Sequence, residues 1–105
     1  TLPLKLQSDV NEIPEYLDTD QIYGFIESEI AKALMLLPQT NQYLTRPSVF
    51  AAHALMARVA LVTGKYQIAE EHAILAVAGS SRLLDFNQID ASPTFPFPLF
   101  NAETI

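Results

Sequence analysis

The sequence predicts an all-α fold made of antiparallel helical hairpins, with about three main helices, and three observations carry this prediction. Apolar residues recur every three or four positions over residues 20–37. Two further apolar stretches between residues 48 and 79 are joined at Gly64-Lys65-Tyr66. Alanines in these stretches stand where two helix backbones would touch. We expect one unit over residues 1–105, with an extended lead at 1–19, helices at 20–79 and an irregular tail at 80–105.

The lead is polar and acidic, and we expect it to be extended. Its carboxylates are Asp9, Glu12, Glu15, Asp18 and Asp20. Their spacing lacks the central glycine and the closing glutamate of an EF-hand loop. We interpret them as solvated charges, with an adventitious calcium site as the alternative.

The first helix is predicted over about residues 20–37. Its apolar stripe consists of Ile22, Ile26, Ile30, Ala33, Leu34 and Leu37. Glu27, Glu29 and Lys32 fall on the opposite face, as in an amphipathic helix. Asp18, Thr19 or Asp20 can cap its start, and Pro38 ends it.

The second helix follows the polar loop 39–47, and its apolar residues lie on nearly every side. Thr45 or Ser48 is expected to cap it, with Pro47 in its first turn. A helix that is apolar all round needs more than one neighbour, so we expect it between the first and third helices. Arg58 interrupts this apolar stretch, and we expect it to pair with a carboxylate or with helix-end carbonyls rather than contact a ligand.

The turn and the third helix complete the hairpin. Gly64 is expected to take the left-handed conformation that ends a helix, Tyr66 to fill the corner, and the third helix to span about residues 66–77 and end at Gly79. The residues that define the hairpin are Ala57, Arg58, Gly64, Tyr66, Ala69 and Ala73. Their spacing is typical of a tetratricopeptide unit. Because the first helix repeats the second half of such a unit, the chain holds about one and a half units.

The tail contains SPTFPFPLF, which is too rich in proline for a helix and too apolar for a solvated linker. Phe95, Phe97, Leu99 and Phe100 would be poorly buried in an isolated chain, which indicates a missing partner surface. Phe95 and Phe97 could stack on a sugar. We prefer the interpretation that they pack against the helices or against a missing part of the protein.

Composition excludes several functions. Six lysines and arginines stand against twelve acidic residues, for a formal charge of −6, so we expect no nucleic-acid partner. The absence of cysteine excludes thiolate chemistry and disulfides. His53 and His72 match no paired metal-ligand spacing, and we interpret them as ordinary helix residues. We expect no catalytic residues, no metal and no cofactor, and residues 49–62 are too few to cross a membrane.

The order of these features resembles the SusD/RagB family of outer-membrane lipoproteins from glycan-harvesting Bacteroidota. The matching residues are Pro3 and Leu4; Ala33, Leu36, Leu37 and Pro38; Arg46, Ala51, Ala52, Ala54, Leu55, Ala57, Arg58, Leu61, Gly64, Tyr66, Ala69 and Ala73; Leu83, Leu84, Phe86 and Asn87; and Phe100, Asn101, Glu103 and Ile105. Ala60 departs from the tyrosine usual in the family. The match covers the middle stretch of such proteins, without the lipid-anchoring cysteine or the carboxy-terminal portion.

The resemblance implies a non-catalytic protein that binds glycan at the cell surface and docks on a SusC-like TonB-dependent transporter. Membrane contact would come only through a lipid anchor that is not in this chain, and most glycan contacts from other parts of the protein. The alternative is a free-standing tetratricopeptide adaptor whose concave face binds a peptide.

Overall fold

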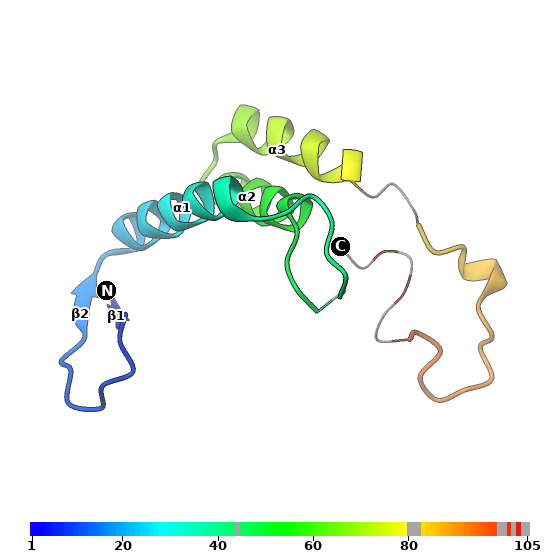
Figure 1. The fold of residues 1–105 in the computed structure, drawn as a ribbon, viewed down its shortest axis with the longest axis horizontal. Helices are drawn as coiled ribbons and strands as arrows, with labels where there is room; N and C mark the ends of the chain where they lie inside the picture. The colour runs from blue at the N-terminus through cyan, green and yellow to red at the C-terminus, as the bar shows by residue number, and fades with distance from the viewer. Residues whose placement is uncertain (44, 80–82, 99–100, 102, 104–105) are drawn as a thin grey trace.

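The computed structural model describes residues 1–43, 45–79, 83–98, 101 and 103. It confirms the all-α fold class, with three α-helices as the main elements (Figure 1). These helices are α1 (Thr19–Leu36), α2 (Val49–Val62) and α3 (Tyr66–Gly79). A small strand pair lies at one end of the helices and the irregular tail lies at the other. Leu99, Phe100 and Ile105, named in the sequence predictions, lie outside the described residues.

The lead is extended, as predicted, but it also folds back on itself. Strand β1 (Leu2–Leu4) pairs antiparallel with β2 (Glu15–Leu17), with Pro3 opposite Tyr16. A turn between them is closed by Asp9, whose Oδ1 accepts a hydrogen bond of 2.9 Å from the backbone N–H of Asn11. Such side-chain turns let a polar segment reverse its direction. Three-residue strands leave no alternating apolar pattern, which explains why the pairing was not predicted.

Helix α1 begins with a capping box. The Asp18 carboxylate accepts from the backbone N–H of Gln21 at 2.8 Å, and the Gln21 side chain accepts from the Asp18 N–H at 2.9 Å. Two backbone donors that have no partner inside the helix are thereby satisfied. The last helical hydrogen bond runs from Leu37 N–H to Ala33 C=O, directly before Pro38.

The loop between α1 and α2 is closed by its own polar groups. The Val49 N–H donates to the Pro38 carbonyl at 2.9 Å, and the Asn41 side-chain amide donates to the carbonyls of Arg46 and Pro47. Ser48 caps α2 through its hydroxyl, which accepts from the Ala51 N–H at 3.2 Å. The prediction that Pro47 lies in the first turn of α2 was wrong, because Ser48 is the N-cap and the helix begins at Val49.

The α2–α3 hairpin is held at both of its ends. At the turn, Gly64 has φ +75°, the left-handed conformation expected of it, and the Lys65 N–H donates to the Ala60 carbonyl at 2.8 Å. At the open end, the Phe50 ring of α2 lies so close to Gly79 of α3 that a Cβ built there would be 2.0 Å from its Cγ. Glycine is therefore needed at both ends, for a backbone angle at one and for space at the other.

The core lies between α1 and α2 and is small. Its buried residues are Ile30, Ala52, Met56 and Val59. Helix α2 packs against both other helices, as its apolar surface predicted. The chain is nevertheless open: its radius of gyration is 17.4 Å, against about 13 Å for a compact domain of this length. It exposes 8301 Å² of surface, where a compact domain of 11.6 kDa exposes about 5,800 Å².

The tail makes a loop of its own. A 3₁₀ turn at Phe86–Gln88 (η1) follows Asp85, whose carboxylate accepts from the Asn87 N–H at 2.9 Å. The Glu103 carboxylate accepts from the Leu84 N–H at 2.8 Å, which joins the end of the tail to its beginning. Polar contacts thus hold the tail together, and it contains no α-helix among its described residues.

Candidate functional site: a groove between α2 and α3

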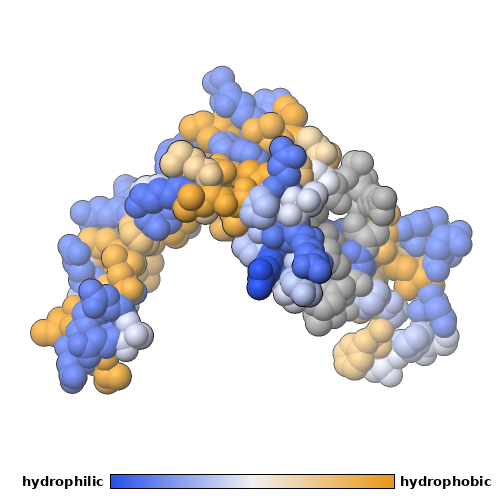
Figure 2. Space-filling view, viewed as in Figure 1, coloured by the Kyte–Doolittle hydropathy of each residue, from blue (hydrophilic) through white to orange (hydrophobic). Residues whose placement is uncertain are grey.

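A groove of ≈ 450 Å³ runs between α2 and α3. Its lining residues are Ala57, Arg58 and Leu61 from α2, and Tyr66, Ala69, Glu70 and Ala73 from α3. Five of the six residues predicted to define the hairpin therefore meet in one place, and the sixth, Gly64, forms the turn beside them. Hydrophobic residues gather over this part of the molecule (Figure 2).

The alanines explain why the groove forms. Ala69 is buried where α3 meets α2, and its small side chain lets the two backbones approach closely. Ala73 is one turn further along α3 and is exposed. A larger side chain at these positions would fill the space between the helices. The floor of the groove is consequently apolar and shallow.

Charged residues stand on both walls of the groove. Arg58 from α2 and Glu70 from α3 are both exposed, and neither makes an ion pair or hydrogen bond within the described part of the chain. The prediction that Arg58 pairs with a carboxylate or helix-end carbonyls was wrong. Its side of α2 faces the open groove rather than a neighbouring helix, so water can solvate the guanidinium.

Tyr66 also differs from the prediction. We expected its ring to fill the corner of the hairpin, but 70% of the side chain is exposed. The ring lines one end of the groove instead. A tyrosine in this position offers an apolar ring face and a hydroxyl to whatever enters the groove.

His53 of α2 and His72 of α3 form a pair that the sequence did not predict. Their Nδ1 atoms are 2.8 Å apart and their ring centroids 5.0 Å apart. At that distance one nitrogen must donate and the other accept, which requires both an N–H and a free lone pair. Desolvation, and secondarily the charge of His72, lower the pKa of His53. The neutral form of His53 is therefore favoured, and the pair joins the two helices only while one of the two nitrogens has a free lone pair.

These histidines do not make a metal site by themselves. No group of three His, Cys, Asp or Glu side chains able to hold a metal ion occurs among residues 1–43, 45–79, 83–98, 101 and 103. The acidic residues of the lead have other positions: Asp18 caps α1 and Asp9 closes the β1–β2 turn, while Glu15 is part of strand β2. They are spread along the lead, but the interpretation as solvated charges is wrong for Glu12, whose Oε2 is buried and has no hydrogen-bond partner among the described residues.

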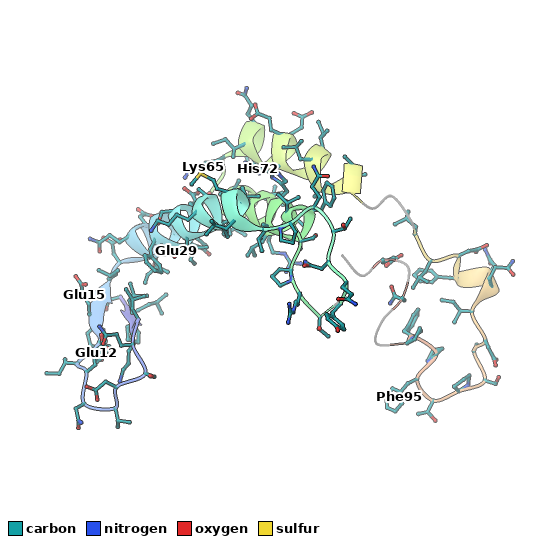
Figure 3. All side chains as sticks on the ribbon, viewed as in Figure 1. Glu12, Glu15, Glu29, Lys65, His72 and Phe95 are labelled. Atoms are coloured by element: carbon teal, nitrogen blue, oxygen red, sulfur yellow. The ribbon has the colours of Figure 1, made fainter. Side chains whose placement is uncertain are left out.

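The two phenylalanines of the tail have different surroundings. Phe97 packs edge-on against Phe86, with ring centroids 5.8 Å apart. Phe95 is 86% exposed, and Figure 3 places it on the outer loop of the tail, away from the helices. Neither ring reaches the α2–α3 groove, whose lining comes from the two helices alone. The preferred interpretation had two alternatives: packing of these rings against the helices is not present, and packing against a missing part of the protein stays a prediction.

The groove can bind by shape and charge. It offers an apolar floor, one cation, one anion and one tyrosine. These groups suit a polypeptide that presents a row of side chains better than they suit a small polar molecule. The signal for it was present in the sequence, since the alanine spacing predicted close helix contact. The sequence did not indicate that one side of the contact between α2 and α3 would remain uncovered.

Comparison of the chain with protein-family models, with curated proteins and with solved structures gives no match. Each helix in the described part of the chain is too short or too polar to span a bilayer.

Proposed function

We propose that this chain is the helical scaffold of a cell-surface glycan-binding lipoprotein of the SusD/RagB type. In this proposal the protein has no catalytic activity and works at the outer membrane with a SusC-like TonB-dependent transporter in glycan uptake. The observation that carries the proposal is the order of residues around the α2–α3 hairpin. Arg46 precedes the hairpin, and Leu83, Leu84 and Asn87 follow it, in the same order as in the family.

The exposed surface supports the part of the proposal that makes this chain one piece of a larger protein. The chain exposes 8301 Å², about 2,500 Å² more than a compact domain of its mass would. Large apolar side chains contribute to this excess, among them Met35, Leu36, Ile74 and Leu83. Exposed apolar surface of this kind marks a region that another surface covers.

In this proposal the helices position other parts of the protein, and those parts make most of the glycan contacts. Among the aromatic residues that the structure describes, Phe95 is the most exposed, because its ring is unpacked whereas that of Phe97 lies against Phe86. Aromatic rings pack against the C–H faces of sugars through apolar contact. We therefore expect Phe95→Ala to weaken glycan binding slightly at most.

The test uses the protein that carries this chain, purified from its own cells. Affinity electrophoresis through gels containing soluble polysaccharides should show retardation by at least one glycan. The protein should also take up labelled palmitate and co-purify with a TonB-dependent transporter. A protein that is not lipidated and is retarded by no glycan would contradict the proposal.

The second candidate is a free-standing tetratricopeptide adaptor that binds a peptide. The α2–α3 hairpin with its left-handed Gly64 favours it, because stacked hairpins of this kind form concave peptide-binding surfaces. It predicts a monomer that captures extended peptides from a random library. Glycan retardation without peptide capture would exclude the adaptor, and the reverse result would support it.

A further inference from the structure

Helices α1 and α3 carry the same pattern of residues. In α1 the pattern is Tyr23, Ile26, Glu27, Ile30 and Ala33, and in α3 it is Tyr66, Ala69, Glu70, Ala73 and Ala76, at identical spacing. Three of these five pairs are identical: tyrosine, glutamate and the last alanine. The two helices therefore present equivalent faces.

In α1 this face is covered by α2. Ile30 is 6% exposed within the core that α1 forms with Met56 and Val59 of α2, and Tyr23 and Ile26 pack against that core. The glutamate of the pattern, Glu27, accepts from the ammonium group of Lys65 at 2.6 and 2.7 Å. Lys65 stands in the turn that directly follows α2 (Figure 3).

In α3 the equivalent face is only partly covered: Ala69 and Ala76 are buried, whereas Tyr66, Glu70 and Ala73 are exposed. Tyr66, Ala69, Glu70 and Ala73 are the α3 side of the α2–α3 groove. Tyr66 is exposed where Tyr23 is half-buried, and Ala73 is exposed where Ile30 is buried. Glu70, which corresponds to Glu27, makes no ion pair within the described residues. The groove thus leaves Tyr66, Glu70 and Ala73 without the helix that covers their counterparts in α1.

We propose that the α2–α3 groove binds an α-helix of the α2 type, with an apolar contact face followed by a lysine that pairs with Glu70. Helical hairpins of one kind stack by burying equivalent faces against the next helix. The charges agree at one contact: the lysine would meet Glu70 as Lys65 meets Glu27. The alanine floor requires the incoming helix to supply the larger side chains.

A second folded copy of this chain is a poor occupant. Its α2 helix already lies between α1 and α3, so the face that would enter the groove is covered. The helix must therefore come from a polypeptide segment whose apolar face is free. This inference concerns helix docking and does not depend on whether the protein binds glycan.

The test uses a fluorescent synthetic peptide of residues Ser48–Lys65, the segment that covers the equivalent face of α1. Titration of the whole chain should raise its anisotropy in a saturable manner. Ala73→Arg should weaken binding by about tenfold or more, because it places a charge on the apolar floor. Ala78→Arg, at an exposed α3 position outside the groove, should change the affinity less than about twofold.

A charge exchange tests the lysine contact. Glu70→Lys in the chain, or Lys65→Glu in the peptide, should each weaken binding severalfold, and the two together should restore it. Glu71→Lys, beside the groove, is the matched control. Circular dichroism should show unchanged helicity for each variant, since these positions are exposed.

Three results would overturn the proposal. The first is no saturable binding of the peptide to the unmodified chain. The second is binding that Ala73→Arg leaves unchanged. The third is a concentration-dependent dimer in sedimentation that Ala73→Arg abolishes, because the occupant would then be a second copy.

Discussion

The contact between Phe50 and Gly79 allows a sharp test of how α2 and α3 are joined. A Cβ on Gly79 would lie 2.0, 2.3 and 2.4 Å from the Cγ, Cδ2 and Cδ1 atoms of the Phe50 ring. A relaxed contact between carbons needs about 3.5–4.0 Å, so Gly79→Ala requires a displacement of about 1.5 Å. The clash includes Cγ, the ring atom nearest the backbone, so rotation of the ring alone cannot relieve it.

The expected change in stability follows from two opposing terms. Overpacking costs about 1–3 kcal/mol. Replacing glycine by alanine in a helix gains at most about 1 kcal/mol, and less at the last helical residue. We therefore expect Gly79→Ala to lower the free energy of unfolding by up to about 3 kcal/mol.

Gly24→Ala in α1 is the matched control. A Cβ there would meet no atom within 4 Å, so alanine should stabilise the protein by about 0.5–1 kcal/mol. Urea unfolding followed by far-UV circular dichroism measures both variants against the unmodified chain. The two substitutions should shift the midpoint in opposite directions, and an equal gain from both would refute the clash.

A double-mutant cycle assigns the cost of Gly79→Ala to the ring. In a Phe50→Ala background the space beside Gly79 is empty, so the additional methyl group should no longer destabilise the hairpin. If Gly79→Ala remained equally costly in that background, its effect would come from the helix end rather than from Phe50.

Three further changes test the turn, the histidine pair and the ion pair. Gly64→Val should cost about 1–2 kcal/mol or more, because φ is +75°; an unchanged urea midpoint would contradict the turn. Burial, then the charge of His72, lower the pKa of His53 below its ordinary 6.5, so the unfolded chain takes up the proton first and stability is lost as the pH falls below about 6.5. His53→Gln should reduce this loss in urea titrations at successive pH values, whereas identical pH profiles would oppose it. Glu27→Gln should cost about 0.3–1 kcal/mol by loss of the partly exposed pair with Lys65, and a cost unaffected by high salt would argue against an electrostatic origin.

The local features of the fold could be predicted from the sequence. Helix bounds follow from apolar spacing and from residues that begin or end a helix, such as Asp18, Ser48 and Pro38. These residues act on the backbone groups next to them, so their effect can be predicted locally. The left-handed turn at Gly64 was readable for the same reason. Strands β1 and β2 were missed because three residues cannot show a period.

The candidate site was predictable only in part. The alanine spacing predicted a close contact between helices. The surroundings of Arg58, Tyr66 and His53, however, depend on how α2 and α3 are rotated about their axes. That rotation is set by packing on both sides of α2, which a single sequence does not specify. We expected Arg58 to have a partner because the apolar surface of α2 predicted burial on every side. The side of α2 that carries Arg58 is open instead.

The equivalent faces of α1 and α3 explain why one pattern gives a core in one place and a groove in the other. Ile26 and Ile30 fill the space between α1 and α2 with their own side chains. Their counterparts Ala69 and Ala73 bring α3 close to α2 and leave an apolar depression beside the contact. The bulk that isoleucine supplies in α1 must come from the incoming side chains at α3, because packing requires the same volume from one side or the other. A helix that binds there should therefore turn its large apolar side chains toward the alanine floor and place a cation beside Glu70.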